Sequence, residues 1–218
     1  MRNKGWIIVC LLGILMIASA GLLCWHNISE SRDAAEYSDE VLGALKEGIP
    51  DPPADSTAPP AEQDLYAPYE QDAGSDPEEA ADIVIGQDAY CGYIVIPALN
   101  LELPVMSSWS YPNLKKAPCR YSGSALTNDL IIAAHNYTSH FGKIRRLTGG
   151  DRILFTDTRG RQFAYAVSFT EVIEGQDVEQ MFSGQAEDWD LTLFTCTLGG
   201  KSRVTIRADR VTDDAQAA

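Results

Sequence analysis

The chain has 218 residues, a formal net charge of −14 and a hydrophobic content of 45%, which suits one ordinary domain with appendages. The negative charge is concentrated in residues 29–82, which hold sixteen acidic and two basic residues, while the remainder is balanced. Nothing in such a chain would neutralise phosphates, so nucleic acid is excluded as a partner. Five cysteines without a CxxC pair or regular spacing predict neither a disulfide framework nor a zinc site.

Residues 6–25 contain no charged side chain, and about 20 apolar residues are what a helix needs to cross a bilayer. The two basic residues before this run place the N-terminus, residues 1–5, in the cytoplasm. We therefore expect a transmembrane signal anchor in contact with membrane lipid, in a single-pass type II protein of the cell membrane whose later residues are extracytoplasmic. Two rival interpretations remain open, a signal-peptidase site at Ala18-Ser19-Ala20 and lipidation of Cys24.

Residues 26–82 are acidic and contain seven prolines. Low hydrophobicity combined with like charge cannot offset the entropy of ordering, so this segment is expected to be an extracytoplasmic linker. A short helix at 34–46 is the only regular element that its pattern allows. The sequence predicts a stalk that lifts a folded domain away from the membrane.

Residues 83–212 have the texture of a β domain, followed by a polar tail at 213–218. Short runs rich in β-branched and aromatic residues alternate with Gly, Pro, Asn and Asp turn signals. The candidate strands are residues 93–96, 101–105, 130–134, 152–155, 163–167, 191–194 and 204–206. Short helices are possible near 141–147 and 178–182. Many short strands at this spacing favour an all-β barrel or sandwich.

Three side chains with catalytic potential lie at strand ends: Cys196 closes one apolar strand, His135 closes another, and Arg203 opens the strand after Cys196. An antiparallel hairpin with Cys196 opposite Arg203 directs Thr195 and Val204 into a core and places thiol and guanidinium together on the outer face. A lone cysteine in a strand is usually a small buried hydrophobe. The combination of a thiol with groups that favour the thiolate is what indicates a nucleophile.

The order of these pieces resembles the sortase signature, in which Thr-Cys ends one strand and an arginine lies on the next. The resemblance extends to Ile131-Ile132-Ala133-Ala134-His135-Asn136, Phe141-Gly142-Lys143-Ile144, Gly149-Gly150-Asp151-Arg152-Ile153 and the segment 96–105. It implies an all-β fold, a closed eight-stranded sortase-like β-barrel with short helices, preceded by one transmembrane helix. It also implies a transpeptidase that acts on cell-wall sorting signals of the Leu-Pro-x-Thr-Gly kind.

The same resemblance implies a role for each site residue. Cys196 would attack the carbonyl at the cleavage point of a sorting-signal peptide from a secreted surface protein and form a thioacyl enzyme. His135 would protonate the departing amine and then deprotonate the incoming one, an amine of a cell-wall peptidoglycan precursor. Arg203 would donate to the oxyanion or position the substrate, and Thr195 would help to line the groove. No cofactor is expected, because a thioester conserves the energy of the broken amide.

Two other classes of function remain: a cysteine endopeptidase on the same scaffold and a non-enzymatic surface binding module. Pilus assembly is the less favoured branch, because Asp76-Pro77 is followed by glutamate rather than an aromatic residue and the tail is short and polar. Glu171, Glu174 and Asp177 are conceivable calcium ligands, but a solvated acidic loop is the commoner explanation. We therefore expect no metal site.

Overall fold

The structure is a computed structural model that describes residues 3–50, 79–182 and 188–211. The helices of this part of the chain are α1 (Asn3–Gly48), α2 (Tyr111–Lys116) and the 3-10 helices η1 (Pro97–Leu99), η2 (Phe141–Arg146) and η3 (Val178–Met181). Its strands are β1 (Ile83–Ile85), β2 (Asp88–Ile96), β3 (Leu101–Met106), β4 (Cys119–Ser122), β5 (Leu130–Ala133), β6 (Arg152–Asp157), β7 (Gln162–Glu174), β8 (Leu191–Cys196) and β9 (Ser202–Arg210).

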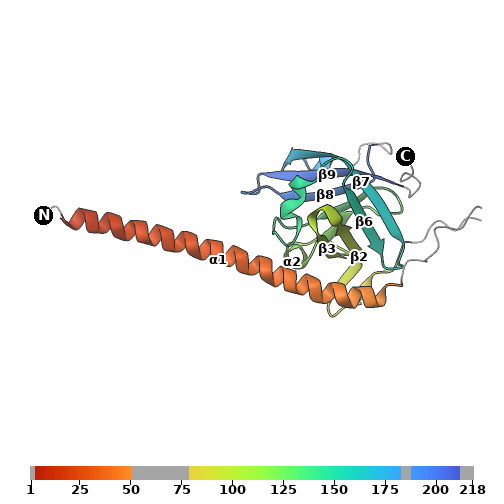
Figure 1. The fold of residues 1–218 in the computed structure, drawn as a ribbon, viewed down its shortest axis with the longest axis horizontal. Helices are drawn as coiled ribbons and strands as arrows, with labels where there is room; N and C mark the ends of the chain where they lie inside the picture. The colour runs from red at the N-terminus through yellow and green to blue at the C-terminus, as the bar shows by residue number, and fades with distance from the viewer. Residues whose placement is uncertain (1–2, 51–78, 183–187, 212–218) are drawn as a thin grey trace, which may run out of the picture.

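Eight of these strands close into a barrel, which confirms the expected fold (Figure 1). The strand order is β1-β2-β3-β4-β5-β8-β9-β7-β6, and pairing of β2 with β6 closes the ring from β2 to β6 while β1 extends β2. Most neighbours are antiparallel, but β3 runs parallel to β4 and β5 runs parallel to β8. The parallel β5–β8 pair brings the ends of two strands to the same edge of the barrel.

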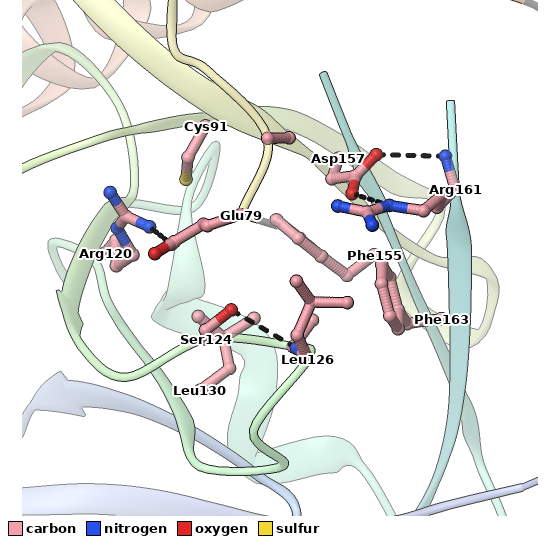
Figure 2. A pocket seen from close by; sticks show the side chains of 12 residues that line it. Glu79, Cys91, Arg120, Ser124, Leu126, Leu130, Phe155, Asp157, Arg161 and Phe163 are labelled. Atoms are coloured by element: carbon pink, nitrogen blue, oxygen red, sulfur yellow. Dashed lines mark hydrogen bonds and ion pairs between the residues drawn. The ribbon is translucent and has the colours of Figure 1, made fainter. Parts of the chain in front are cut away.

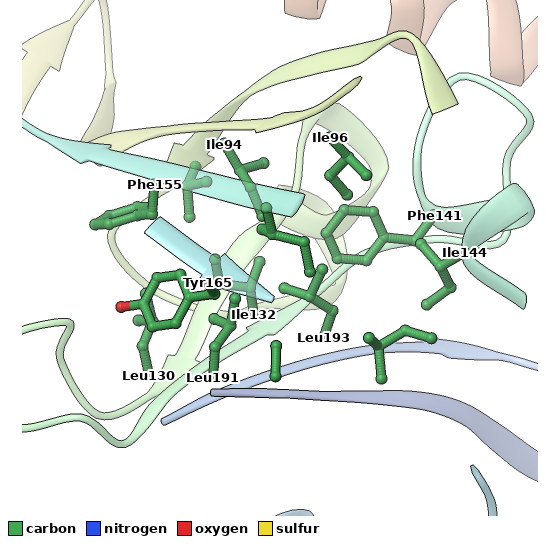
Figure 3. Packing of buried hydrophobic residues seen from close by; sticks show 14 of the residues in the cluster. Ile94, Ile96, Leu130, Ile132, Phe141, Ile144, Phe155, Tyr165, Leu191 and Leu193 are labelled. Carbon is green, nitrogen blue, oxygen red and sulfur yellow. The ribbon is translucent and has the colours of Figure 1, made fainter. Parts of the chain in front are cut away.

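The barrel interior is filled by inward-facing side chains from strands on all sides (Figure 3). Along β8, Leu191 and Leu193 alternate inward, and both are fully buried with Ile206 of β9. Phe141 and Ile144 of η2 reach into the same cluster and close one end of it. Each such side chain contributes about 1.5–3 kcal/mol on burial, so the core fixes the strands that carry the site.

Closure of the barrel depends on one glycine of β2. Gly92 has a φ of 150°, and a Cβ at this position would lie 2.1 Å from the carbonyl oxygen of Thr156. The register of β2 against β3 also shifts between Tyr90 and Gly92. Such a bulge bends the strand, so β2 can pair with β1 over its first residues and with β6 from Gly92 onward.

Helix α1 corrects the expectation of an unstructured linker for residues 26–48. The helix continues from the apolar run without a break to Gly48 (Figure 1). The exposed apolar run meets the length and composition of a candidate membrane span. Beyond it, the buried residues Ala34, Ser38, Val41, Leu45 and Ile49 recur every three or four positions, the spacing of one helical face. The acidic residues between them conceal this stripe in the composition.

The second half of α1 docks on the outside of the barrel. Val41 and Leu45 pack in a second apolar cluster with Tyr90 and Met106 of the barrel. Asp88 on β2 accepts hydrogen bonds from the Tyr37 hydroxyl at 2.6 Å and from the Lys116 ammonium at 2.7 Å. Burial would raise the pKa of Asp88, but the bonds from Lys116 and Tyr37 outweigh it and hold that pKa below its usual range.

Two further expectations concern the linker and the cysteines. Residues 51–78 of the expected linker and 212–218, which include the expected polar tail, lie outside the described residues. All five cysteines are free. Burial raises the pKa of both Cys91 and Cys119 to about 12, so these two thiols are protonated and unreactive.

Candidate active site

Cys196 is the last residue of β8 and lies directly opposite Arg203 on β9. The pairs Thr195–Val204 and Leu193–Ile206 precede it in the same ladder, so the register expected from the sequence is confirmed. Thr195, Val204, Leu193 and Ile206 are buried, whereas Cys196 is half-buried. Strand alternation thus turns the thiol away from the core toward the outer face.

The loop between the two strands is short and internally bonded. The backbone N–H of Thr197 donates to Ser202 at 2.9 Å, and that of Gly200 donates to Thr197 at 2.9 Å. Gly199 and Gly200 have φ values of 92° and 73°, a region that favours glycine. These contacts fix the separation of Cys196 and Arg203 at the base of the loop.

Arg203 turns its guanidinium toward this loop. Its Nη1 donates to the carbonyl oxygen of Gly200 at 2.9 Å and to that of Ser202 at 3.2 Å. The bonds that Arg203 makes within the described part of the chain use Nη1. The Nε and Nη2 hydrogens of the fork are therefore the donors left for a ligand.

His135 reaches the same edge of the barrel from β5. In the parallel β5–β8 pair Ala133 lies opposite Phe194, so His135 follows Ala133 by two residues just as Cys196 follows Phe194. The Ala134 N–H donates to the carbonyl of Phe194 at 3.1 Å, which carries the pairing beyond β5. The histidine and the cysteine therefore lie level with each other on adjacent strands.

Thr195 fastens this arrangement from within. Its hydroxyl donates to the carbonyl oxygen of Ala134 at 2.8 Å, and its side chain is buried. This bond joins the residue before Cys196 to the residue before His135. Thr195 also lines the groove beside Cys196, as expected, but its hydroxyl is already bound to the protein.

The His135 ring stacks on Tyr137, with 4.7 Å between ring centroids and an angle of 26°. Its Nε2 is buried and has no hydrogen-bond partner among the described residues. Burial lowers the pKa of His135 because it disfavours the imidazolium. A buried nitrogen without a partner costs free energy, so this atom is placed to exchange a proton with a ligand.

His140 has a different environment. It is fully buried beside Tyr137, at 5.5 Å between ring centroids. Burial, reinforced by the nearby His135, lowers the pKa of His140 to about 4. His140 is therefore neutral at physiological pH and acts as a core residue.

A groove of about 580 Å³ opens beside Cys196. Its lining is Asn27, Asn136, Thr138, Phe141, Gly142, Ile144, Arg145, Thr195, Cys196, Thr197, Leu198 and Val204. Sequence reasoning missed Asn27, which α1 brings to the groove from far away in the chain. The β8–β9 hairpin extends from the barrel toward the N-terminal end of α1 (Figure 1), which agrees with this contact.

The outer face of β8 and β9 is covered beyond Cys196. Arg207 is only 1% exposed and donates to Thr192 at 2.8 Å and to the carbonyl of Met181 at 3.0 Å. It also forms an ion pair with Glu171 at 2.7 Å. Glu171, one of the conceivable calcium ligands, is thus a partner of Arg207 that helps to hold η3 against the strands.

Phe194, which shares the face of Cys196, belongs to an aromatic cluster. Its ring meets Tyr121 edge-on at 5.3 Å, and Tyr121 in turn contacts Trp109 at 5.9 Å and Phe182 at 6.3 Å. Trp109 and Phe182 are exposed. An aromatic surface therefore runs over β4 and β8 toward Cys196.

Another cavity lies near the start of β5, at the end of the barrel away from His135 (Figure 2). It encloses about 20 Å³ between Cys91, Leu130 and Phe163. Its polar rim is paired, since Asp157 binds Arg161 and Glu79 binds Arg120. A space this small, next to a protonated thiol, offers no room for a peptide.

A family model of the sortase domain matches residues 94–211, more than half of the chain. No curated protein sequence matches the chain. Among solved structures, the chain is similar to sortase C of Streptococcus pneumoniae, with a TM-score of 0.51 and 26% identity over 56% of this chain and 67% of that one. It is similar to Clostridium perfringens sortase C with the C-terminal cell wall sorting motif, with a TM-score of 0.50 and 26% identity over 56% of this chain and 71% of that one.

Sortase C1 of GBS pilus island 1 gives a TM-score of 0.50 and 25% identity over 58% of this chain and 66% of that one. The chain thus spans about two thirds of the length of these structures. The matched region runs from the middle of β2 to the end of β9, so it contains the barrel and the strand ends that carry Cys196, His135 and Arg203. The chain therefore belongs to the sortase family of cysteine transpeptidases.

Proposed function

We propose that the protein cleaves a Leu-Pro-x-Thr-Gly-type sorting signal at Cys196 and transfers the acyl group to an amine of a peptidoglycan precursor. The observation that carries the proposal is the opposed pair Cys196–Arg203 at one barrel edge, with His135 level with Cys196 on the adjacent strand. A similar structure, Clostridium perfringens sortase C, contains a C-terminal cell wall sorting motif. This supports a peptide of the same kind as the substrate.

In the first half-reaction the Cys196 thiolate attacks the carbonyl carbon at the cleavage point. The Nε and Nη2 donors of Arg203 stabilise the oxyanion that forms. His135, in its imidazolium form, gives a proton to the departing amine, and the tetrahedral intermediate collapses to a thioester. The new C–S bond replaces the broken C–N bond, and the amine leaves with its proton.

In the second half-reaction an amine attacks the thioester carbonyl. His135, now neutral, takes a proton from the incoming amine, and the Cys196 thiolate leaves as the new amide forms. A thioester and an amine suffice for this exchange, so the proposed reaction needs no cofactor. The aromatic surface of Trp109, Tyr121 and Phe194 is suited to hold an extended apolar peptide along the strands that lead to Cys196.

We further propose that α1 anchors the enzyme in the cell membrane with the barrel on the extracytoplasmic side. Two basic residues precede the apolar run, which is the pattern of a cytoplasmic N-terminus. Protease added to intact cells or protoplasts should digest the barrel. Protection of the barrel until the membrane is permeabilised would contradict this orientation.

The decisive assay uses a fluorogenic Leu-Pro-x-Thr-Gly peptide with and without an amine acceptor. A transpeptidase yields the amide product when acceptor is present. An unchanged product with continued hydrolysis would instead indicate a cysteine endopeptidase. A surface binding module would show no covalent capture of the peptide by mass spectrometry, whereas the proposed enzyme should lose that capture in Cys196→Ala.

A further inference from the structure

The juxtamembrane part of α1 contacts the loop that follows His135. The Ser139 hydroxyl donates to the carbonyl of Ser31 at 2.9 Å, and Tyr137 donates from its hydroxyl to Glu30 Oε2 at 3.2 Å. The other carboxylate oxygen of Glu30 pairs with the Lys115 ammonium at 3.4 Å. One acidic residue of α1 therefore joins the His135 loop and the short helix α2.

Tyr137 is the bridge between Glu30 and His135. Its side chain is 8% exposed, its ring stacks on His135, and its hydroxyl is held by Glu30. Burial, with Glu30 beside it, raises the pKa of Tyr137 to about 12, so the phenol keeps its proton and remains a donor. A ring held at both its face and its hydroxyl fixes the plane on which the histidine rests.

Opposite charges flank His135 from two helices. Burial lowers the pKa of His135, the negative charge of Glu30 raises it, and the positive charge of Lys115 lowers it further. Burial would raise the pKa of Glu30, but Lys115 and the bond from Tyr137 hold it below its usual range, so Glu30 is ionised at neutral pH.

The remaining titratable and charged groups around His135 are His140 of its own loop, Cys196 of β8 and Arg203, the cross-strand neighbour of Cys196. His26, one turn before Glu30, lies 3.6 Å from the Glu30 carboxylate. Among the charged groups contributed by the helices, Glu30 is therefore the one that favours the imidazolium form of His135.

We propose that Glu30 is a positioning residue for His135, acting through Tyr137, so that the helix emerging from the membrane forms part of the active site. The inference rests on the acid–base role proposed for His135. Glu30 and Tyr137 fix the ring plane, and the carboxylate keeps a larger share of His135 protonated when the departing amine needs its proton. Asn27, one turn earlier on the same helix, lines the groove beside Cys196.

The test compares Glu30→Gln with Lys115→Gln in the full chain in detergent micelles. Both variants break the same ion pair, but they remove charges of opposite sign. The chain has three histidines, so the ring resonance of His135 can be followed by NMR with 13C-labelled histidine and assigned with His26→Gln and His140→Asn. We expect Glu30→Gln to lower the pKa of His135 and Lys115→Gln to raise it.

The kinetic readout should follow the titration. Glu30→Gln should lower kcat several-fold at neutral pH while KM for the donor peptide stays constant, and Glu30→Asp should recover part of that loss. Glu36→Gln is the matched control, because it removes an exposed charge from the same helix and should change neither kcat nor the titration. Docking of α1 does not depend on Glu30, since Val41, Leu45 and the Asp88 contacts hold it elsewhere.

Shifts of the His135 pKa in the same direction in both variants would overturn the proposal, because they would mean that the ion pair only ties α1 to the barrel. Unmoved titrations, together with loss of activity in His135→Ala, would overturn the role of Glu30 and leave the proposed function intact. Opposite shifts with unchanged kcat would overturn the acid–base role of His135 and the catalytic role of Glu30 with it.

Discussion

Arg203 lies opposite Cys196 in the β8–β9 ladder, yet its guanidinium donates to the carbonyl of Gly200, 2.9 Å away. The side chain is thus tethered by one nitrogen at the base of the loop, with the rest of the fork free to bind. This geometry suits a residue that holds an oxyanion or a peptide carbonyl, since a preorganised donor needs little reorganisation when the charge forms.

Arg203→Lys should lower kcat/KM by about 10²–10³, the usual effect of removing one oxyanion donor. A lysine ammonium is a point charge and cannot bind Gly200 and a substrate at once. Steady-state assays with a fluorogenic sorting peptide measure the loss. Arg146→Lys on the exposed side of η2 is the control and should retain full activity. Turnover of Arg203→Lys at the level of the unaltered protein would contradict the role given to Arg203.

His135→Ala and His140→Ala should separate chemistry from stability. Loss of the half-buried His135 should reduce kcat by about 10²–10⁴, the usual contribution of a general acid or base, with little change in Tm. Loss of the fully buried His140 should lower Tm because it leaves a cavity, while the folded fraction retains turnover. Thermal unfolding and active-site titration of each variant provide the comparison. Equal losses of kcat in the two variants would make the assignment of His135 unsafe.

Thr195→Val should impair both folding and catalysis. The variant keeps the buried shape but removes the donor to the Ala134 carbonyl, and an unsatisfied buried group costs about 1–3 kcal/mol. His135 should lose its alignment with Cys196, which would lower kcat. Thr195→Ser preserves the hydroxyl and should recover most of the activity. If Thr195→Val matched the unaltered protein in both urea unfolding and kcat, the fastening role would be wrong.

Asp88→Asn should loosen the second half of α1, since hydrogen bonds to a charged group contribute about 1.5–3 kcal/mol each. The pKa of Asp88 is lowered in the folded protein, so its contribution is present above the unfolded value of about 3.9 and is lost as pH falls through the lowered folded value. Hydrogen exchange of residues 34–48 as a function of pH measures this docking. Exchange that is equally slow in Asp88→Asn would show that the apolar contacts of Val41 and Leu45 suffice.

The barrel and the β8–β9 register could be predicted because alternation along these strands is strong. Leu191, Leu193 and Thr195 all face inward, and a shift of one residue would expose them. Strand β4 was missed because Cys119-Arg120-Tyr121-Ser122 is four residues long and has no β-branched side chain. Helix α2 was missed for a similar reason: its sequence is short, and only the Ser110 cap bonded to Asn113 marks its start.

The contribution of α1 to the site had no local signal. Glu30 and Tyr137 are separated by 107 positions, and their contact follows from how the whole helix docks. The docking stripe of Ala34, Val41 and Leu45 was present in the sequence, but acidic residues outnumbered it in any average over the segment. Periodicity would have found the helix; it would not have found which loop the helix touches.

The unbroken path of α1 determines where the enzyme can work. Asn27 borders the groove and lies only two residues beyond Trp25, the end of the expected membrane span, whereas one helical turn advances only about 5.4 Å. In the proposed topology the reaction takes place against the lipid headgroups, at a height set by a rigid helix. Encounters with membrane-tethered substrates then become a search in two dimensions, and a peptide whose cleavage point lies far above the bilayer must bend back to be processed.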